Sequence, residues 1–325
     1  MKRLVSISIF ISLLFPFIVL GQGNKTLPDV RQLFLTKQWC DSTNNIFNRT
    51  EIYKASDIAI IVVDMWDAHW CKSMNKKASV LIPKMNRTLD AARELGIKII
   101  FAPTETVDFY DKYPQRQRIK NLKKIQPLQV NVFNPPPLPW GRTGGCECGP
   151  DRPCQEKSVW TRQNEALPIK DDDLISDKVD EINTFCKLNG IKTLIFVGEA
   201  SNMCVTWTRS FSIIPMIRYG YETIVVRDLV EAISGNGYDP DRRVKDPFFT
   251  PEKGADSTLK HIEKYICNTI SANQILLAVG KEVINRPKLL RIKMYTKEFV
   301  KNYQPKGRNQ SFRQQCYDYN LGGWE

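Results

Sequence analysis

One cysteine and one aspartate stand where nucleophilic chemistry is favoured. Cys204 follows a short apolar run, residues 193–197, and precedes a segment with helical character. The N–H groups and the dipole at the start of a helix favour the thiolate, which is the nucleophilic form of cysteine. Asp64 ends a second apolar run, residues 58–63. Open α/β folds place their active sites at the carboxyl ends of parallel strands, so we predict that the two side chains meet at one sheet edge.

A carboxylate is the expected base, because histidine is scarce. The chain has two histidines, His69 and His261, which support neither a Ser-His-Asp triad nor a two-histidine zinc site. Asp64, with a raised pKa, can take the thiol proton of Cys204. Arg162, which follows a short apolar pair, is expected to hold the charged pair. The alternative is structural: Asp64 as a helix cap or core ion pair, and Cys204 as a small buried side chain.

The elements that must position these groups alternate along the chain. A doubly wound α/β fold with a parallel sheet and right-handed crossovers is therefore predicted for residues 57–280. Residues 22–56 are expected to form an irregular lead-in. The apolar patterns predict strands at 58–63, 97–101, 159–160, 194–197, 223–226 and 274–279, and helices near 81–95, 179–189, 204–220 and 258–266.

Residues 102–156 interrupt this alternation with an insertion rich in proline and cysteine. The stretch 134–140 is too proline-rich for a helix or a central strand. Cys146, Cys148 and Cys154 follow it. With Cys204 set aside, eight of the nine cysteines remain, an even number that suits disulfides in a secreted protein. We therefore expect a disulfide-stapled insertion, with a metal site as the alternative that lacks a fourth close ligand.

Both ends of the chain differ in composition from its middle. Lys2 and Arg3 precede an apolar stretch and then small residues, which predicts a signal peptide over residues 1–21 and a secreted or periplasmic protein. An uncleaved membrane anchor is the alternative; after cleavage no membrane insertion is expected. Residues 281–325 form a basic C-terminal extension of a chain with formal charge +12. No nucleic-acid motif accompanies this charge, which favours a solvated tail over a nucleic-acid partner.

From about residue 57 to 279 the chain resembles the isochorismatase-like cysteine hydrolases, which include nicotinamidases and N-carbamoyl amidohydrolases. The motifs that carry the resemblance are Ile60-Ile-Val-Val-Asp-Met-Trp66, Val159-Trp-Thr-Arg162 and Gly198-Glu-Ala-Ser-Asn-Met-Cys-Val205, followed by Thr208. The resemblance implies a three-layer, Rossmann-like fold with a six-stranded parallel sheet. It also implies an Asp-Lys-Cys triad, in which Asp64 and Cys204 match and Arg162 replaces the lysine.

The same resemblance implies a geometry for the turn before Cys204. The peptide bond between Glu199 and Ala200 is expected to be cis, which turns the Ala200 N–H, with that of Cys204, towards a developing oxyanion. Asn202 lies in this turn and is expected to bind substrate.

The substrate pocket and its chemistry follow from neighbouring residues. Trp66 and Trp160 are expected to wall the pocket, with core packing as the alternative, while His69 either orients substrate or caps a turn. Residues 101–110 lack the histidines that hold the nicotinamidase metal, so neither a catalytic metal nor another cofactor is expected. Arginine at position 162 can stabilise charge but is not suited to shuttle a proton.

These features together predict a secreted cysteine hydrolase that acts on a small molecule. It would cleave a C–N bond of an amide or carbamoyl compound through a thioester on Cys204. Two alternatives are a non-catalytic extracellular binding protein on the same fold and an isochorismatase-type ether hydrolase. Relatives of this kind commonly assemble, so a homo-oligomer is also an expectation.

Overall fold

The computed structural model describes residues 31–138, 146–148, 154, 159–233, 238–239, 244–245 and 251–279. The expected signal peptide and the basic C-terminal extension lie outside these residues. Within the described part, no helix combines the length and the apolar character that a membrane crossing requires.

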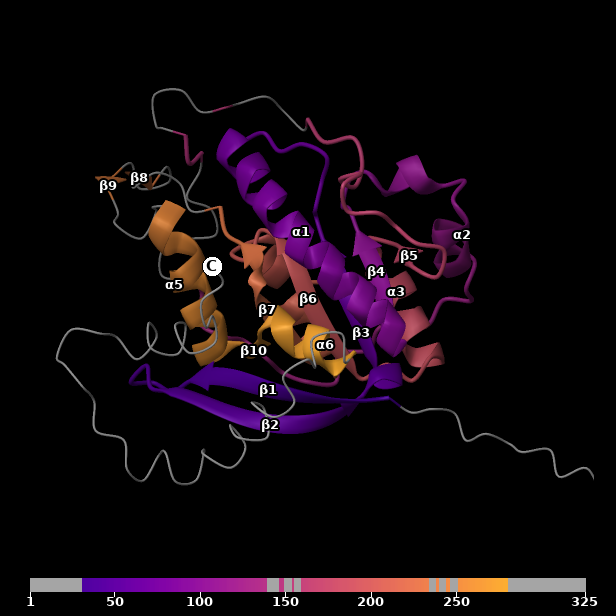
Figure 1. Cartoon of the computed structure of the whole chain (residues 1–325), viewed down its shortest axis with the longest axis horizontal. Helices are drawn as coiled ribbons and strands as arrows, with labels where there is room; N and C mark the ends of the chain where they lie inside the picture. The colour runs from indigo at the N-terminus through magenta and orange to yellow at the C-terminus, as the bar shows by residue number, and fades with distance from the viewer. Residues whose placement is uncertain are drawn as a thin grey trace, which may run out of the picture. The chain divides into compact units, whose positions relative to one another are not determined.

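An eight-stranded sheet forms the centre of the fold (Figure 1). Its strands are β1 (Gln32–Cys40), β2 (Ile46–Lys54), β3 (Ile58–Val63), β4 (Lys98–Ala102), β5 (Leu174–Ile175), β6 (Thr193–Glu199), β7 (Glu222–Glu231) and β10 (Asn268–Ile270). The strand order is β2-β1-β10-β7-β6-β3-β4-β5. All neighbours from β10 to β5 pair in parallel, whereas β1 and β2 join antiparallel. The predicted α/β fold is confirmed, with eight strands in place of six. A separate antiparallel pair consists of β8 (Tyr238–Asp239) and β9 (Val244–Lys245).

The two additional strands come from the segment expected to be an irregular lead-in. β1 and β2 form a long hairpin at one end of the sheet, drawn in indigo in Figure 1. Leu33 and Leu35 are buried on one side of β1, while Phe34 between them is exposed. This period of two is that of a strand with one buried face, and the prediction missed it because polar residues dilute the apolar pattern.

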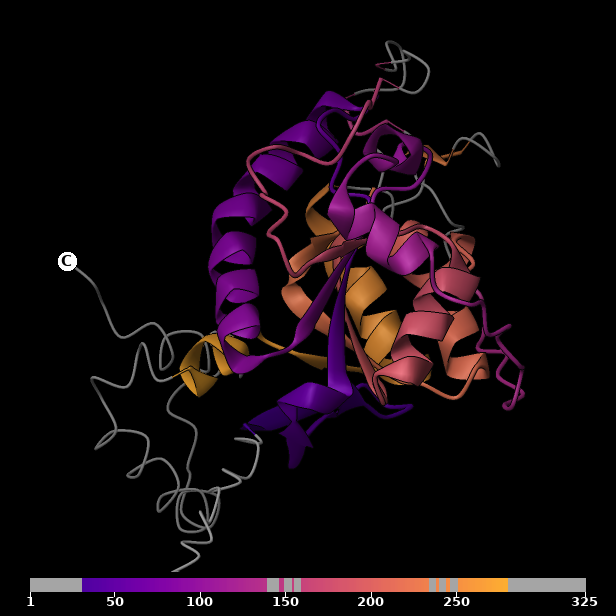
Figure 2. The same ribbon diagram turned by 90° about the vertical axis from the view of Figure 1, so that its right-hand side faces the viewer.

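Helices cover both faces of the sheet, as Figure 2 shows edge-on. Along β3, Ile58, Ile60 and Val62 pack towards α1 and α6, whereas the alternating residues pack towards α3, α4 and α5. All six β3 side chains are buried, as expected for a central parallel strand. The helices are α1 (Lys72–Leu95), α2 (Pro114–Lys120), α3 (Val179–Leu188), α4 (Ile213–Arg218), α5 (Pro251–Tyr265) and α6 (Ala272–Ala278), with short turns η1 (Ala55–Asp57), η2 (Val107–Tyr110) and η3 (Cys204–Thr208).

Helix α1 forms where the apolar spacing predicts it. Leu81, Met85 and Leu89 recur at helical spacing and are buried. Gly96 ends the helix with φ of 85°, a left-handed conformation that glycine adopts without a steric penalty.

Three other predicted elements were wrong. Residues 159–160 are not a strand; the sheet edge is the short β5. The last strand is β10, and residues 274–278 of the expected strand lie in α6. The apolar run at 274–279 was misassigned because a short run of this kind fits either a strand or a buried helix. The helix expected after Cys204 is broken, because η3 ends at Thr208 and α4 begins at Ile213.

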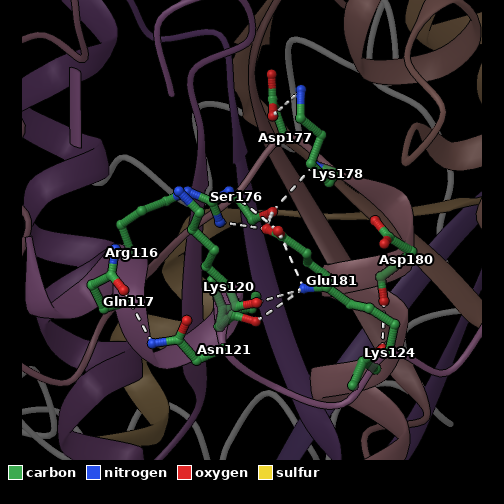
Figure 3. A network of polar contacts seen from close by, with 12 residues as sticks. Arg116, Gln117, Lys120, Asn121, Lys124, Ser176, Asp177, Lys178, Asp180 and Glu181 are labelled. Atoms are coloured by element: carbon green, nitrogen blue, oxygen red, sulfur yellow. Dashed lines mark hydrogen bonds and ion pairs between the residues drawn. The ribbon is translucent and has the colours of Figure 1, made fainter. Parts of the chain in front are cut away.

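A buried ion-pair network joins α2 to α3 (Figure 3). The guanidinium of Arg116 pairs with the carboxylate of Glu181, and both side chains are buried. Ser176 Oγ also donates to Glu181, and Lys124 Nζ lies 3.2 Å from it. Hydrogen bonds from Arg116 and Ser176 outweigh the effect of burial, so the pKa of Glu181 lies below its ordinary value.

The eight described cysteines are all free thiols. The expectation of a disulfide-stapled insertion is therefore not supported among them. Cys186 is a buried thiol on the α3 side of the sheet.

Candidate active site

Strands β3 and β6 are neighbours, which brings their carboxyl ends together. Val63 pairs with Gly198 at the last position of their parallel register. A Cβ on Gly198 would lie 2.1 Å from the Val63 carbonyl oxygen, and its φ is 115°. Only glycine fits this close approach of two backbones. The segments carrying Asp64 and Cys204 consequently leave the sheet side by side.

Asp64 and Cys204 meet at this edge, as predicted. The Cys204 thiol lies next to the Asp64 carboxylate, and this contact lowers the pKa of Asp64 and raises that of Cys204. The Thr104 N–H donates to Asp64 Oδ1 at 2.8 Å. Asp64 is fully buried and has φ of 47°, a backbone conformation uncommon outside glycine that clusters at functional sites.

The cation beside Asp64 is Arg209. Its Nε and Nη2 each lie 3.0 Å from Asp64 Oδ2. The position follows from η3, in which the Thr208 N–H donates to Met203 O at 3.0 Å, an i to i+5 bond. This wide turn returns Arg209 to the side of Cys204. The sequence does contain this cation five residues after Cys204. In a regular α-helix that spacing would not return Arg209 to the side of Cys204, so the helical pattern of the sequence does not indicate it.

Arg162 does not take the place expected for it. Its Nη2 pairs with Glu165 at 3.0 Å, and its guanidinium lies over the ring of Phe109, 5.4 Å from the centroid. Its segment is a loop tied to Asp67, whose N–H donates to Arg162 O at 2.9 Å. Since this loop is not a strand end, it does not aim the side chain at Asp64. The expectation that Arg162 holds the Asp64–Cys204 pair is corrected in favour of Arg209.

The resting nucleophile is a thiol. Burial and the charge of Asp64 raise the pKa of Cys204 to about 12, against the opposing effects of Arg209 and Thr208. This corrects the expectation of a thiolate stabilised by a helix start, since η3 has five residues and burial dominates. Burial also raises the pKa of Asp64, while Arg209 and Thr104 act in the opposite direction.

The turn before Cys204 leaves two N–H groups without backbone partners. The peptide bond between Glu199 and Ala200 is cis. Among the described hydrogen bonds, neither the Ala200 N–H nor the Cys204 N–H donates to a backbone carbonyl. The Glu199 side chain is buried beneath the turn, and burial raises its pKa well above the ordinary value. Ala200 and Cys204 thus offer donors next to the thiol.

Asn202 is part of the scaffold of this turn. It is buried; its Nδ2 donates to Ile233 O at 2.9 Å, and its Oδ1 accepts the Ile233 N–H at 3.0 Å. Both ends of the amide are engaged with the backbone of the segment after β7. The expected contact of Asn202 with substrate is therefore corrected to a positioning role.

Two tryptophans form a flat wall beside Arg209. Trp66 and Trp160 stack with their centroids 4.2 Å apart at 8°. The Arg209 guanidinium lies over Trp66, 5.9 Å from the centroid. Trp160 Nε1 donates to Glu105, which also lies 3.6 Å from Arg209. These contacts place the predicted aromatic wall next to the ion pair.

His69 borders the same aromatic surface and also caps the turn before α1. Its ring lies 5.9 Å from that of Trp160. The Cys71 N–H donates to His69 Nδ1 at 2.9 Å, immediately before α1 begins. Burial lowers the pKa of His69 to about 4, so the ring is neutral at pH 7 and carries its proton on Nε2. His69 thus has the capping role and retains one donor.

No family model matches the sequence, and no curated protein sequence matches it significantly. Solved structures of similar fold include a cysteine hydrolase from Pseudomonas syringae pv. phaseolicola 1448A, with TM-score 0.45, 15% identity and coverage of 70% of this chain and 94% of that chain. An isochorismatase-like hydrolase from Alkaliphilus metalliredigens has TM-score 0.38, 14% identity and coverage of 70% and 98%. N-carbamoylsarcosine amidase from Thermoplasma acidophilum has TM-score 0.36, 14% identity and coverage of 67% and 97%.

This chain is similar in structure to isochorismatase-like hydrolases. The TM-scores are below 0.5 and the identities are 15% or lower, so the catalytic chemistry of the chain rests on its own residues.

Proposed function

We propose that this protein is a cysteine hydrolase that cleaves a C–N bond of a small amide or carbamoyl compound. The observation that carries the proposal is the contact of the Cys204 thiol with the Asp64 carboxylate, which Arg209 holds in place. A nucleophile, a base and a cation that orients the base form the pattern of nucleophilic catalysis.

Cys204 Sγ attacks the substrate carbonyl carbon while its proton passes to Asp64. Because the resting pKa of Cys204 is about 12, the proton has to leave as the C–S bond forms, which makes Asp64 a general base. The oxyanion is stabilised by the N–H groups of Ala200 and Cys204. Asp64 then gives the proton to the leaving nitrogen, the C–N bond breaks, and a thioester remains on Cys204.

Water completes the cycle with the same groups. Asp64 removes a proton from the water as its oxygen attacks the thioester carbonyl. The C–S bond breaks, and the departing sulfur of Cys204 takes the proton back from Asp64. The acid is released, and both residues return to their resting protonation states.

Arg209 contributes a fixed positive charge. Guanidinium keeps its proton at all working pH values, so it orients Asp64 and does not shuttle protons. Its contact with Asp64 favours the carboxylate over the carboxylic acid, and a general base needs the carboxylate form.

The surroundings of the site favour a small planar substrate. The stacked Trp66 and Trp160 offer a flat apolar surface beside the ion pair, and the His69 Nε2–H and the Glu105 carboxylate offer polar contacts. We further propose that the protein is secreted or periplasmic, on the strength of its apolar N-terminal stretch, and that it assembles as a homo-oligomer.

The test is a hydrolysis screen of small primary amides and N-carbamoyl compounds, in which the release of ammonia is measured. We expect turnover in the wild type, loss in Cys204→Ala, and an acyl adduct on Cys204 in quenched intact-mass spectra. Undiminished turnover in Cys204→Ala would contradict a thioester. Absence of turnover across the screen, with ligand binding retained, would instead support a binding protein.

A further inference from the structure

Four cysteines gather where the insertion meets the start of α1. Cys71 is the N-cap of α1, while Cys146, Cys148 and Cys154 come from the insertion. The Sγ atoms of Cys71, Cys146 and Cys148 lie within 4.8 Å of one another. The thiol of Cys154 hydrogen-bonds those of Cys146 and Cys148. Residues about 75 apart in the sequence thus form one sulfur cluster.

The spacing of these sulfurs differs from that of disulfides. Cys71 Sγ lies 3.7 Å from Cys146 Sγ and 4.0 Å from Cys148 Sγ. A disulfide requires about 2.05 Å. Four sulfurs bound tetrahedrally to zinc at about 2.3 Å would lie about 3.8 Å apart. The distances from Cys71 Sγ to the sulfurs of Cys146 and Cys148 are close to this tetrahedral separation.

Backbone N–H groups point at the sulfur of Cys146. The N–H groups of Cys148 and Cys154 donate to it, each with an N to Sγ distance of 3.4 Å. Donors of this kind stabilise negative charge on sulfur, which is the form that binds metal.

Backbone N–H groups also lie beside the sulfurs of Cys71 and Cys148. The Glu147 N–H lies next to the Cys71 sulfur, whereas the Met74 N–H donates its hydrogen bond to Cys71 O at 3.0 Å. Cys148 accepts a hydrogen bond from the N–H of Ser73. Ser73 and Met74 lie in the first turn of a 24-residue helix, whose dipole favours anionic groups at this end. Four clustered thiolates would repel one another unless a cation lay between them.

We propose that Cys71, Cys146, Cys148 and Cys154 bind one structural zinc ion. Four thiolates are the ligand set of closed zinc sites, which leave no position for substrate or water. The proposed zinc is therefore separate from catalysis, and the expectation of no catalytic metal is unaffected. Cys71 supplies the ligand that the insertion alone lacks.

The site fixes the insertion against the wall of the active site. Cys71 and Cys146 pack in one apolar cluster with Ala200 and Ile233. Glu147, between two of the ligands, lies 2.7 Å from Lys77 of α1. Zinc binding would hold the turn that presents the Ala200 N–H, so metal loss should loosen both the insertion and this turn.

The experiment uses the full chain, purified without chelator or reductant. Zinc is measured by inductively coupled plasma mass spectrometry in the wild type, Cys148→Ser and Cys71→Ser. Cys186→Ser is the matched control, because Cys186 is a buried thiol in a different part of the core. We expect one zinc per chain in the wild type and the control, and its loss in the other two. Cys148 is exposed, so its variant should remain folded even if Cys71→Ser does not.

Cobalt provides an independent readout. Cobalt(II) added to the metal-free chain should give thiolate-to-metal charge transfer and the visible bands of tetrahedral cobalt, with both weakened in Cys148→Ser. A chain without metal, a chain with iron, disulfides among the four cysteines, or zinc unchanged in Cys148→Ser would each overturn the proposal. None of these readouts depends on hydrolase activity.

Discussion

Arg209 contacts Asp64 through two nitrogens, Nε and Nη2, each 3.0 Å from Asp64 Oδ2. The other carboxylate oxygen accepts the Thr104 N–H. The carboxylate is therefore fixed in orientation and charge beside the Cys204 thiol. This relationship makes Asp64 a base and Arg209 the residue that positions it.

The alkylation rate of Cys204 should be low, because the side chain is a buried, protonated thiol. We expect iodoacetamide to label Cys204 slowly at pH 7, because its pKa is about 12. Asp64→Asn should speed labelling, since Asp64 raises this pKa by its charge and its contact with the thiol. Peptide mass spectrometry of a pH series checks both statements, with Cys186 as an internal buried thiol. An unchanged labelling rate in Asp64→Asn would show that Asp64 does not act on Cys204.

The loss of activity at low pH should be governed by the protonation of Asp64. The general base must be ionised, so kcat/KM should fall as pH drops through the folded pKa of Asp64, which burial raises above that of a free aspartate. Arg209→Met removes a charge that lowers this pKa, so this loss of activity should occur at higher pH. Arg162→Met is the control and should leave the pH range of the loss unchanged. A pH range unchanged in Arg209→Met would contradict the assignment.

Gly198 should tolerate no side chain. Gly198→Ala places a Cβ 2.1 Å from Val63 O, which would push β6 from β3 and part Cys204 from Asp64. Gly190→Ala is the matched control, because Gly190 also has positive φ but has open space where a Cβ would be added. We expect the control to lose about 1–2 kcal/mol and Gly198→Ala to lose clearly more, or to fail to fold. Equal losses in urea titrations would disprove the steric argument.

The network between α2 and α3 should depend on pH through Glu181. The pKa of Glu181 is lowered in the folded state, so its contribution is present above the unfolded pKa, about 4.3, and is lost as pH falls through the folded value. Glu181→Gln removes one partner of a buried pair, which costs about 3–5 kcal/mol.

The difference from wild type in urea midpoints should therefore shrink below about pH 4. The exposed Glu165→Gln should change stability by less than about 0.5 kcal/mol. If Glu181→Gln also changed stability by less than about 0.5 kcal/mol at pH 7, the network would not stabilise the fold.

Much of the fold follows from local patterns. The β-branched run that forms β3, and the residues at helical spacing in α1, are buried as predicted. The parallel sheet then places Asp64 and Cys204 together because strand ends share an edge. In β1 the alternating signal is weaker, because threonine, lysine and glutamine share the strand with its leucines.

The parts that were missed depend on distant contacts or an unusual period. Arg209 reaches Asp64 because η3 turns with i to i+5 bonds, which sequence periodicity does not indicate. Cys71 joins Cys146 across the start of α1, a pairing that only the tertiary fold reveals. Arg162 was expected at the active site because a strand was predicted directly before it. That strand is absent, and the guanidinium of Arg162 pairs with Glu165 instead.

The most direct test of the Cys204–Asp64–Arg209 assignment compares two arginine variants on one amide substrate. The measurement is kcat/KM of Arg209→Met and Arg162→Met, with circular dichroism to verify that both are folded. We predict that Arg209→Met loses activity by a factor on the order of 10²–10³, while Arg162→Met stays within about threefold of wild type. A large loss in Arg162→Met with little change in Arg209→Met would contradict these roles.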